Sequence, residues 1–599
     1  MASPAITQTV QPLEGLRIAA SGPPELTGLA TAHLRYLGAR TAPEQPGPAK
    51  GGAARLALSG GDFGEREAAV RWSADRTSGI ADEATAQAAT GIMAVHGRRD
   101  GAPRGLAVDY AAAATGVLTV QGLLAALVGQ ARGGPAAGVR TSADRAGLLV
   151  VSQYLAAAGA DEGEAAELAP GGPPFTSADG TLFELETLDP GAWAAFWRAL
   201  EAPADALRAG WRPFQFRYAT ACAPFPDALH TTTRAHTWQR IREAAALAGA
   251  EVCRLRTLAE RAAEHAADHD AAPWELAPYG SGHRAPRATP TAARPLAGLT
   301  VLEAGRRIQA PLAAHLLGLL GADVVRIEPP GGDPLRGMPP ACSGISARWL
   351  ALNRGKRAVE IDIKSGADRR RLLGMAAGAD VFLHNWAPGK AAELGLDHTD
   401  LAAVNPALVY AYTSGWGTGG RIADAPMGTD FMVQARTAVG EAARPRGEAP
   451  APSLMTLLDV LGGLLGTEAV LAGLLLRERT GRGVRVDSSL LGASDVLLGP
   501  ALRRVRRGEQ PRRPAGFRRP LPTADGWIAP ADSCAAAAAA YDLTSLPTGE
   551  ALAQLRAHGL TATAVTTDPA DLRHDPRFTG SISRDAHGAP TVPDPWSFA

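Results

Sequence analysis

An aspartate stands just ahead of a long apolar run, where a carboxylate could act as a nucleophile. Asp459 precedes residues 460–476, an apolar stretch long enough for a buried helix. Backbone N–H groups and the dipole at a helix start favour an ionised carboxylate. Such a carboxylate either attacks an electrophilic carbon or simply caps the helix. The residue by itself leaves both interpretations open.

Four polar motifs precede Asp459, and their order is more informative than any one of them. Taken singly, GGDP is typical of a turn, NRGKR of a solvated basic loop, and NWAPG of a helix start with proline in its first turn. SGWGTGG carries glycines that let backbone approach a ligand closely. The motifs occupy residues 328–337, 352–362, 384–389 and 414–420.

The segments between these motifs predict an α/β domain. Residues 299–304 and 322–328 are short apolar runs typical of buried strands, and residues 312–320 between them favour a helix. Strand, helix and strand in that order imply a parallel pair, and the pattern continues to residue 414. We therefore expect a parallel, Rossmann-like sheet flanked by helices on both faces. Ligands of such sheets bind beyond the carboxyl ends of the strands, where the four motifs lie.

The chain also repeats itself. PLEGLRIAA from Pro12 is echoed by PLAGLTVLE from Pro295, about 283 residues later. The run around Asp109 is echoed around Asp459, 350 residues later, so the copies are unequal. We predict two halves, 1–293 and 294–599, joined by an exposed linker over residues 280–294. In this alignment Asp109 occupies the place of Asp459.

The halves differ in what they retain. The first half has no counterpart of NRGKR, HNWAPG or SGWG but keeps a long tail from Pro173, whereas the end of the second half, from Leu521, is shortened. We expect the first half to be a degenerate copy that serves as scaffold and lid, with Asp109 as a vestigial helix cap. Each half should add a smaller α+β domain to its sheet.

Composition excludes several classes of function. Sixty Lys plus Arg balance sixty Asp plus Glu, so nothing favours nucleic acid or an anionic membrane surface. The four cysteines are scattered without a CxxC pair, so we expect neither a disulfide framework nor a metal site. Residues 111–131 could cross a bilayer, but their counterpart carries Glu468, which favours buried helices. The start of the chain lacks the pattern of a signal peptide, so we expect a cytoplasmic protein.

Together these motifs resemble the class III acyl-CoA transferases, the CaiB/BaiF family that includes formyl-CoA transferase-like proteins. The similarity covers about residues 295–505, with a weaker match from Asp571. It rests on PLAGLTVLEAG, LGADVVRIEPPGGDP, NRGKRAVEIDIK, ADVFLHNWAPG, NPALVYAYTSGWG, GTDFMVQA, Asp459 and RTGRGVRVDSSL.

The resemblance implies an acyl-CoA:carboxylate CoA-transferase (an EC 2.8.3-type enzyme) with Asp459 as covalent nucleophile, forming an aspartyl-CoA thioester. Coenzyme A and acyl-CoA would be substrates, and no cofactor would be held permanently. Phosphates need cations and backbone donors, whereas the thioester end needs small and polar side chains. The expected CoA contacts are Gln309, Ala310, Arg326, Arg336, Arg354, Lys356, Arg357, Asn385, Trp386 and Lys390. Glu393 stands where the family often has a basic residue, although Lys390 is close by.

Two further interpretations remain. The chain could be a CoA-binding pseudoenzyme or partner subunit, or an acyl-CoA isomerase or racemase on the same fold. The racemase branch has a histidine where this chain has Thr429, which cannot act as a general base near neutral pH. We expect the neighbouring Asp430 to be structural. Family members are interlocked homodimers, so this chain is expected to be either a pseudo-dimer or a homodimer.

Overall fold

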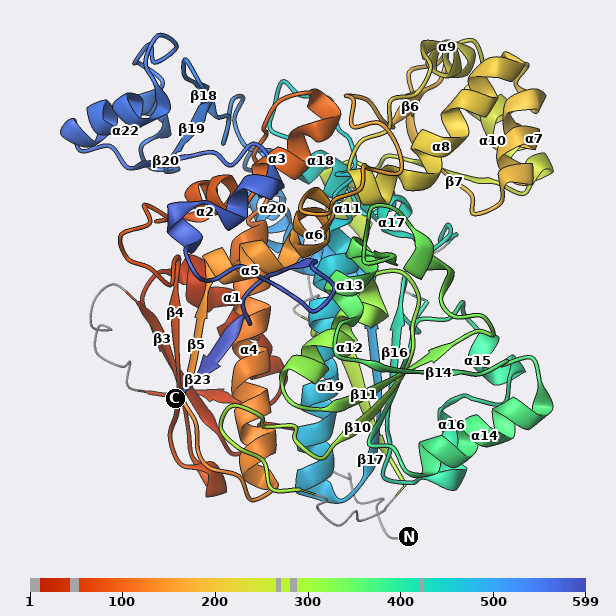
Figure 1. The fold of residues 1–599 in the computed structure, drawn as a ribbon, viewed down its shortest axis with the longest axis vertical. Helices are drawn as coiled ribbons and strands as arrows, with labels where there is room; N and C mark the ends of the chain where they lie inside the picture. The colour runs from red at the N-terminus through yellow and green to blue at the C-terminus, as the bar shows by residue number, and fades with distance from the viewer. Residues whose placement is uncertain (1–10, 44–52, 265–270, 281–287, 421, 423) are drawn as a thin grey trace.

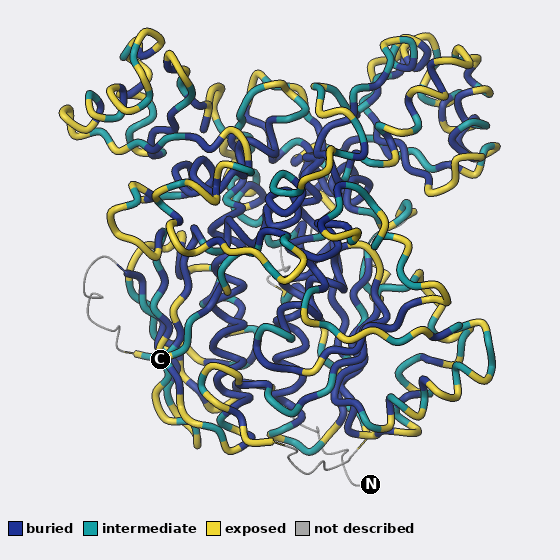
Figure 2. Tube along the Cα trace, in the orientation of Figure 1, coloured by how far each residue is buried: buried dark blue, intermediate teal, exposed yellow. Residues whose placement is uncertain are grey.

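Two sheets enclose a central layer of helices (Figure 1). The computed structural model describes residues 11–43, 53–264, 271–280, 288–420, 422 and 424–599. The expected linker therefore lies partly outside the described residues. Figure 2 shows that the central helices are buried along most of their length, whereas the exposed residues lie mainly in the outer loops and on the outside of the two small units at the top, each of which has a core of its own.

The second-half sheet is parallel, as the sequence predicts. Its strand order is β14-β11-β10-β15-β16-β17-β9, and all neighbours run parallel except the edge strand β9. The strands are β14 (Arg357–Glu360), β11 (Asp323–Glu328), β10 (Thr300–Ala304), β15 (Val381–His384), β16 (Val409–Ser414), β17 (Gly483–Ser489) and β9 (Trp274–Tyr279). The accompanying helices include α12 (Gln309–Leu319), α13 (Ala347–Asn353), α14 (Gly366–Ala377), α15 (Lys390–Glu393), α16 (His398–Val404), α17 (Asp430–Arg436), α18 (Val439–Ala442) and α20 (Leu490–Arg506).

The first-half sheet is mixed rather than parallel. Its order is β2-β1-β3-β4-β5-β23, in which β3 runs antiparallel to both neighbours. The strands are β2 (Arg40–Thr41), β1 (Arg17–Ser21), β3 (Ala54–Ser59), β4 (Arg66–Arg71), β5 (Val139–Ser142) and β23 (Trp596–Phe598). Its helices include α1 (Pro24–Tyr36), α2 (Glu83–Ala89), α3 (Ile92–Gly97), α5 (Ala143–Val150) and α6 (Ser152–Ala158). The shorter segment between the two repeated segments of this half, from Pro12 and around Asp109, thus folds differently from its counterpart in the second half.

Two long apolar helices form the centre of the molecule. These are α4 (Tyr110–Ala131) and α19 (Leu457–Thr480), which pack side by side between the sheets (Figure 1). Their most apolar windows are 100% and 94% buried, respectively, inside the protein. A helix that is apolar all round needs such a site, so these segments are core helices, as the sequence indicates. Gln121 of α4 donates to the carbonyl of Leu464 in α19 at 2.6 Å.

Each half completes the sheet of the other. Strand β9, from the end of the first half, pairs antiparallel with β17, and β23, at the end of the chain, pairs antiparallel with β5. These reciprocal edge strands tie residues far apart in the sequence into shared sheets. The two halves are therefore interlocked rather than merely adjacent.

The small units are exchanged in the same way (Figure 1). The first-half unit lies above the second-half sheet and packs on α17, and the second-half unit packs on α2 of the first half. The first-half unit contains β6 (Phe175–Thr176), β7 (Leu182–Glu186), β8 (Glu251–Arg254), α7 (Pro190–Ala199), α8 (Ala204–Thr220), α9 (Asp227–Arg234) and α10 (Trp238–Ala248), with α11 (Leu258–Glu264) leading to β9. The second-half unit contains β18 (Leu521–Pro522), β19 (Trp527–Pro530), β20 (Ala562–Ala564), α21 (Ala535–Ala538) and α22 (Thr548–Ala557).

Candidate functional site

Asp459 lies in the first turn of α19, but it does not cap that helix. The backbone N–H groups of Leu458 and Asp459 both donate to Oδ2 of Asp430, at 2.7 Å each. Asp430 is 3% exposed and is held in turn by the side-chain amide of Gln434. Among the described residues, the Asp459 carboxylate has no hydrogen-bond or ion-pair partner, and its side chain is only partly buried. The nucleophile candidate is therefore bare, and the structural role expected for Asp430 is that of the cap.

The environment of Asp459 does not favour its ionised form. Burial, followed by the nearby Asp430 carboxyl, raises the pKa of Asp459 to about 8, with Arg307 opposing and Glu186 adding to the increase. We expected the helix start to keep this carboxylate charged, and that expectation is wrong here. The reason is that Asp430 already takes the two backbone donors at the helix start. Burial also raises the pKa of Asp430, to about 6.

The loop after β10 brings Gln309 and Ala310 to the start of α19. A Cβ atom on Gly462 would lie 2.8 Å from the Gln309 amide nitrogen, and one on Gly463 would lie 2.9 Å from the Gln309 carbonyl oxygen. Glycine at these positions lets α19 approach the loop one turn beyond Asp459. The Gln309 side chain also donates to the carbonyl of Ser414 at 3.4 Å, so the ends of β10 and β16 meet here.

Asn385 and Trp386 join the same group of loops. The Asn385 side chain accepts from the Arg306 amide at 2.8 Å and donates to the Arg306 carbonyl at 3.0 Å. Trp386 packs against His384 with ring centroids 4.8 Å apart and stays partly exposed. The carboxyl ends of β10, β15 and β16, which are neighbours in the sheet, thus surround one place, as expected for a parallel sheet.

Two of the expected cations are buried in the protein instead. Glu303 is fully buried on β10 and forms ion pairs with Arg326 and with Lys356, whose side chains are 3% and 2% exposed. Burial lowers the pKa of Lys356 to about 8. A buried carboxylate needs such partners, so the structure does not offer Arg326 or Lys356 to a ligand phosphate.

The other expected cations are dispersed. Arg336 is about one-third exposed, pairs with Glu328 at 2.8 Å and stacks over Trp349. Arg354 donates to the carbonyls of Leu350 and Pro590, and Lys390 pairs with Glu393 at 2.7 Å on the surface. Surface pairs of this kind are weak and open readily to a ligand.

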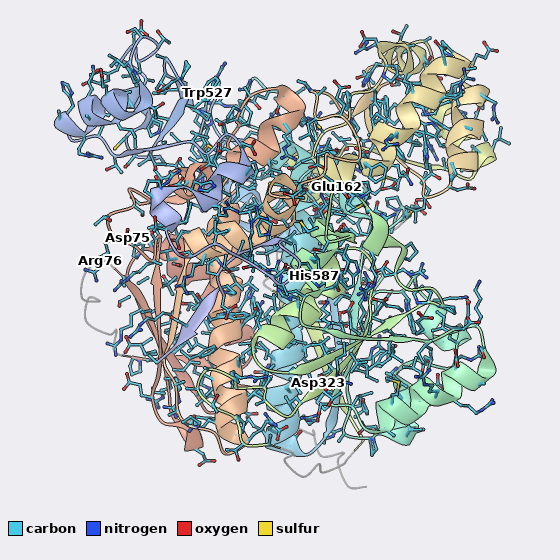
Figure 3. All side chains as sticks on the ribbon, viewed as in Figure 1. Asp75, Arg76, Glu162, Asp323, Trp527 and His587 are labelled. Atoms are coloured by element: carbon cyan, nitrogen blue, oxygen red, sulfur yellow. The ribbon has the colours of Figure 1, made fainter. Side chains whose placement is uncertain are left out.

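Arg357 reaches the wrong end of the sheet. Its side chain pairs with Asp323, the first residue of β11, and not with a group at the carboxyl edge. Figure 3 labels Asp323 in the lower part of the molecule, away from the small units, of which Trp527 marks one. The structure does not bring Arg357 to the candidate site.

The first half supplies side chains that the sequence motifs did not predict. Glu186 on β7 accepts from the Thr429 hydroxyl at 2.8 Å and pairs with Arg217 at 3.1 Å. Tyr218 follows on α8 and lies under the Arg307 guanidinium, 5.6 Å from ring centroid to guanidinium carbon. The only sequence signal was the long tail from Pro173, which ends up over the second half.

The contacts at the two helix starts assign a different first-half residue to the position of Asp459. Glu83 accepts from the N–H groups of Ala111 and Ala112, at 2.8 and 2.7 Å, and Gln87 holds Glu83, as Asp430 and Gln434 do in the second half. Residues in equivalent contacts are separated by 347 positions, not 350. The pairs are Glu83 and Asp430, Gln87 and Gln434, Leu106 and Ser453, Ala111 and Leu458, Ala112 and Asp459.

Ala112 therefore stands where the second half has its carboxylate, and the assignment of Asp109 to that place is wrong. Asp109 is not a functioning cap either, because its side chain makes no capping hydrogen bond. It pairs with Arg518 at 2.7 Å, and Arg518 also bonds Asp532 and the carbonyls of Leu106 and Val108. Arg518 of the second half thus binds the segment just before α4 in the first half.

Comparison with known proteins agrees with the duplicated layout. The sequence profile described as CoA-transferase family III matches twice, over residues 73–288 and 296–574. A mouse succinyl-CoA:glutarate CoA-transferase is 33% identical over 207 residues, 34% of this chain and 47% of that protein. The beta subunit of a succinyl-CoA–L-malate CoA-transferase from Chloroflexus aurantiacus is 36% identical over 206 residues, 33% of this chain and 50% of the relative. The chain spans about half the length of these curated relatives.

A solved structure is matched over nearly its whole length by about half of this chain. A CAIB/BAIF family protein from Brucella suis matches with a TM-score of 0.45 and 28% identity, over 50% of this chain and 91% of that one.

Proposed function

Because this chain belongs to CoA-transferase family III, we propose that it moves CoA from an acyl-CoA to an acceptor carboxylate through Asp459. The observation that carries the proposal is the bare carboxylate of Asp459 at the meeting point of the loops after β10, β15 and β16. The named relatives transfer CoA between carboxylic acids, which supports the same reaction class.

The proposed reaction proceeds through two exchanges at one carboxylate. A carboxylate oxygen of Asp459 attacks the thioester carbon, the C–S bond breaks, and a mixed anhydride and CoA thiolate result. The thiolate attacks the aspartyl carbonyl, forms the aspartyl-CoA thioester and releases the first acid as its carboxylate. The acceptor carboxylate then attacks that thioester, the C–S bond breaks, and a second mixed anhydride and CoA thiolate result. The thiolate attacks the acceptor's carbonyl carbon in this anhydride, forms the new acyl-CoA and releases the Asp459 carboxylate.

The surrounding residues would hold the reactants. The Gln309 amide would place a polar side chain beside the start of α19, next to the Ser414 carbonyl that precedes the glycine-rich loop. Asn385 and Trp386 would line the path of CoA, with Arg336, Arg354 and Lys390 as the remaining expected cations. Ala310 is fully buried and would shape the loop from behind.

We further propose that the chain is a pseudo-dimer. The exchanged strands β9 and β23 and the exchanged small units support this arrangement, with one complete site and one site that lacks the nucleophile at Ala112. The first half would then serve as scaffold and as the lid over Asp459.

The function is tested by turnover of acyl-CoA with candidate carboxylate acceptors. Asp459→Asn should lower the rate by about a thousandfold or more, because the covalent step loses its nucleophile. Asp109→Asn is the matched control, since it makes the same change at the partly exposed acid of the first half, and it should retain activity. Undiminished turnover in Asp459→Asn refutes the proposal and leaves a CoA-binding protein without transferase chemistry.

A further inference from the structure

The loop after β10 carries an arginine that has no acidic partner among the described residues. Arg307 is exposed, and its backbone has φ 61°, in the left-handed region that long side chains avoid at a cost of about 1 kcal/mol. Such a conformation persists only where the surrounding structure holds it, and it is common at binding sites. The conformation of Arg307 is therefore held by the surrounding loop and not by its own backbone preference.

Two contacts fix where the guanidinium lies. It stacks over Tyr218, which the first half contributes from α8, and the Tyr218 hydroxyl in turn donates to the sulfur of Met338 at 3.3 Å. Gln309, two residues later, packs against the turn of α19 that follows Asp459. The positive charge of Arg307 also acts on the carboxyl of Asp459, although the two side chains form no ion pair. The loop after β10 thus carries the guanidinium on the same short segment as Gln309, which contacts α19 one turn beyond the nucleophile.

The proposed reaction changes the charge that Arg307 faces. Asp459 is negative only in its ionised, reactive form and is neutral whenever it carries an acyl group or CoA, so in both acylated forms a guanidinium nearby has no negative neighbour at Asp459. A substrate anion would be stabilised there, and a planar guanidinium binds a carboxylate through two parallel hydrogen bonds. The reacting carboxyl of the substrate must be at Asp459 itself. An anion at Arg307 other than a CoA phosphate is therefore a second group on the same acid.

Resting on the proposed function, we propose that Arg307 binds a second carboxylate of the transferred acid and so selects dicarboxylic acids and their CoA thioesters. Tyr218 orients the guanidinium, which makes the preference a joint property of both halves. Arg306 serves as the comparison, because its contacts in the described part of the chain are those of its backbone with Asn385, whereas Arg307 is the one that stacks on Tyr218.

The test compares succinyl-CoA with butanoyl-CoA, which have equal chain length and differ in the second carboxylate. The rate at which each donor forms a covalent adduct is measured for the wild type, Arg307→Gln and Arg306→Gln. We expect the wild type to prefer succinyl-CoA about 10- to 100-fold, as for a hydrogen-bonded charge pair. Arg307→Gln should abolish this preference by slowing succinyl-CoA alone. Arg306→Gln removes the same charge from the same loop and should keep the preference.

Equal slowing of both donors in Arg307→Gln overturns the inference, since Arg307 would then serve CoA or Asp459 in general. An unchanged preference overturns it as well. If neither donor modifies the wild type, the proposed function fails, and calorimetric binding of free succinate decides the remaining question. Succinate binding that is weakened in Arg307→Gln but not in Arg306→Gln sustains the anion site, and equal binding by both variants contradicts it.

Discussion

The chemistry of this chain rests on two carboxyl groups with divided tasks. Asp430 is fully enclosed and caps α19, whereas Asp459 is left bare beside it. The two carboxyl groups repel each other when both are ionised. Asp459, which has no hydrogen bonds to its carboxylate, is the one whose pKa rises to about 8. A nucleophile that is not solvated by the protein is reactive once it is ionised.

Adduct formation should therefore increase with pH. Because burial and the Asp430 charge raise the pKa of Asp459 to about 8, the reactive carboxylate becomes more populated as pH rises through that value. The rate at low acyl-CoA concentration, which reports the free enzyme, should climb and level off above it. Asp430→Asn keeps an oxygen acceptor for the helix but removes the charge, so its midpoint should move to lower pH. A profile that is flat from pH 6 to 9 in the wild type contradicts this reading.

The raised pKa of Asp459 should also affect the free energy of unfolding. The folded-state pKa of Asp459 lies above its ordinary value, so ionisation opposes folding, with a cost that is absent below about pH 4 and grows until about pH 8. Asp459→Asn should then stabilise the protein at pH 7 by roughly 1 to 3 kcal/mol, after allowance for the side chain's partial exposure. Denaturant unfolding at pH 7 and pH 4 measures the effect, which should shrink at the lower pH. Destabilisation at pH 7 would show that the carboxylate has a partner.

At the scale of elements, the caps of α4 and α19 form a matched pair. Glu83 and Asp430 each accept two backbone N–H groups at a helix start. Replacing either by alanine leaves two buried donors unpaired, at a cost of about 1 to 3 kcal/mol. Glu83→Ala and Asp430→Ala should lose similar stability in denaturant unfolding. Only Asp430→Ala should also impair adduct formation, and equal impairment by both variants would argue against a single active half.

The parallel strands of the second half were predictable because apolar runs alternate with helical segments and polar loops. The register of α4 against α19 was not. Both helices are apolar all round, and a shift of three residues along a helix keeps nearly the same face. The sequence alone is therefore equally compatible with Asp109 or Ala112 as the equivalent of Asp459. The capping contacts of Glu83 and Asp430 decide between them.

The cations were misplaced for a different reason. NRGKR and VVRIE supply charge near the expected ligand, but Glu303 lies inside an apolar strand and draws Arg326 and Lys356 into the core. A carboxylate within a buried strand was the available signal. Arg307, in contrast, was visible as part of GRR after a strand, but its relation to Asp459 depends on packing with Tyr218 of the other half.

At the scale of the whole molecule, the exchange of edge strands binds the halves. Cleavage of a protease site introduced within residues 288–293 should leave two fragments that stay associated and unfold together, because β9 and β23 lie in the partner sheets. Gel filtration and thermal unfolding of the cut protein measure this. Separation of the fragments under native conditions would contradict the interlocked arrangement.

The most direct test of the account is the mass of the intact protein after incubation with an acyl-CoA and hydroxylamine, followed by peptide mapping. A nucleophilic carboxylate that passes through an anhydride or thioester is converted to a hydroxamate, and we predict this change on Asp459 and on no residue of the first half. A protein that turns over acyl-CoA while Asp459 stays unmodified would contradict the central claim.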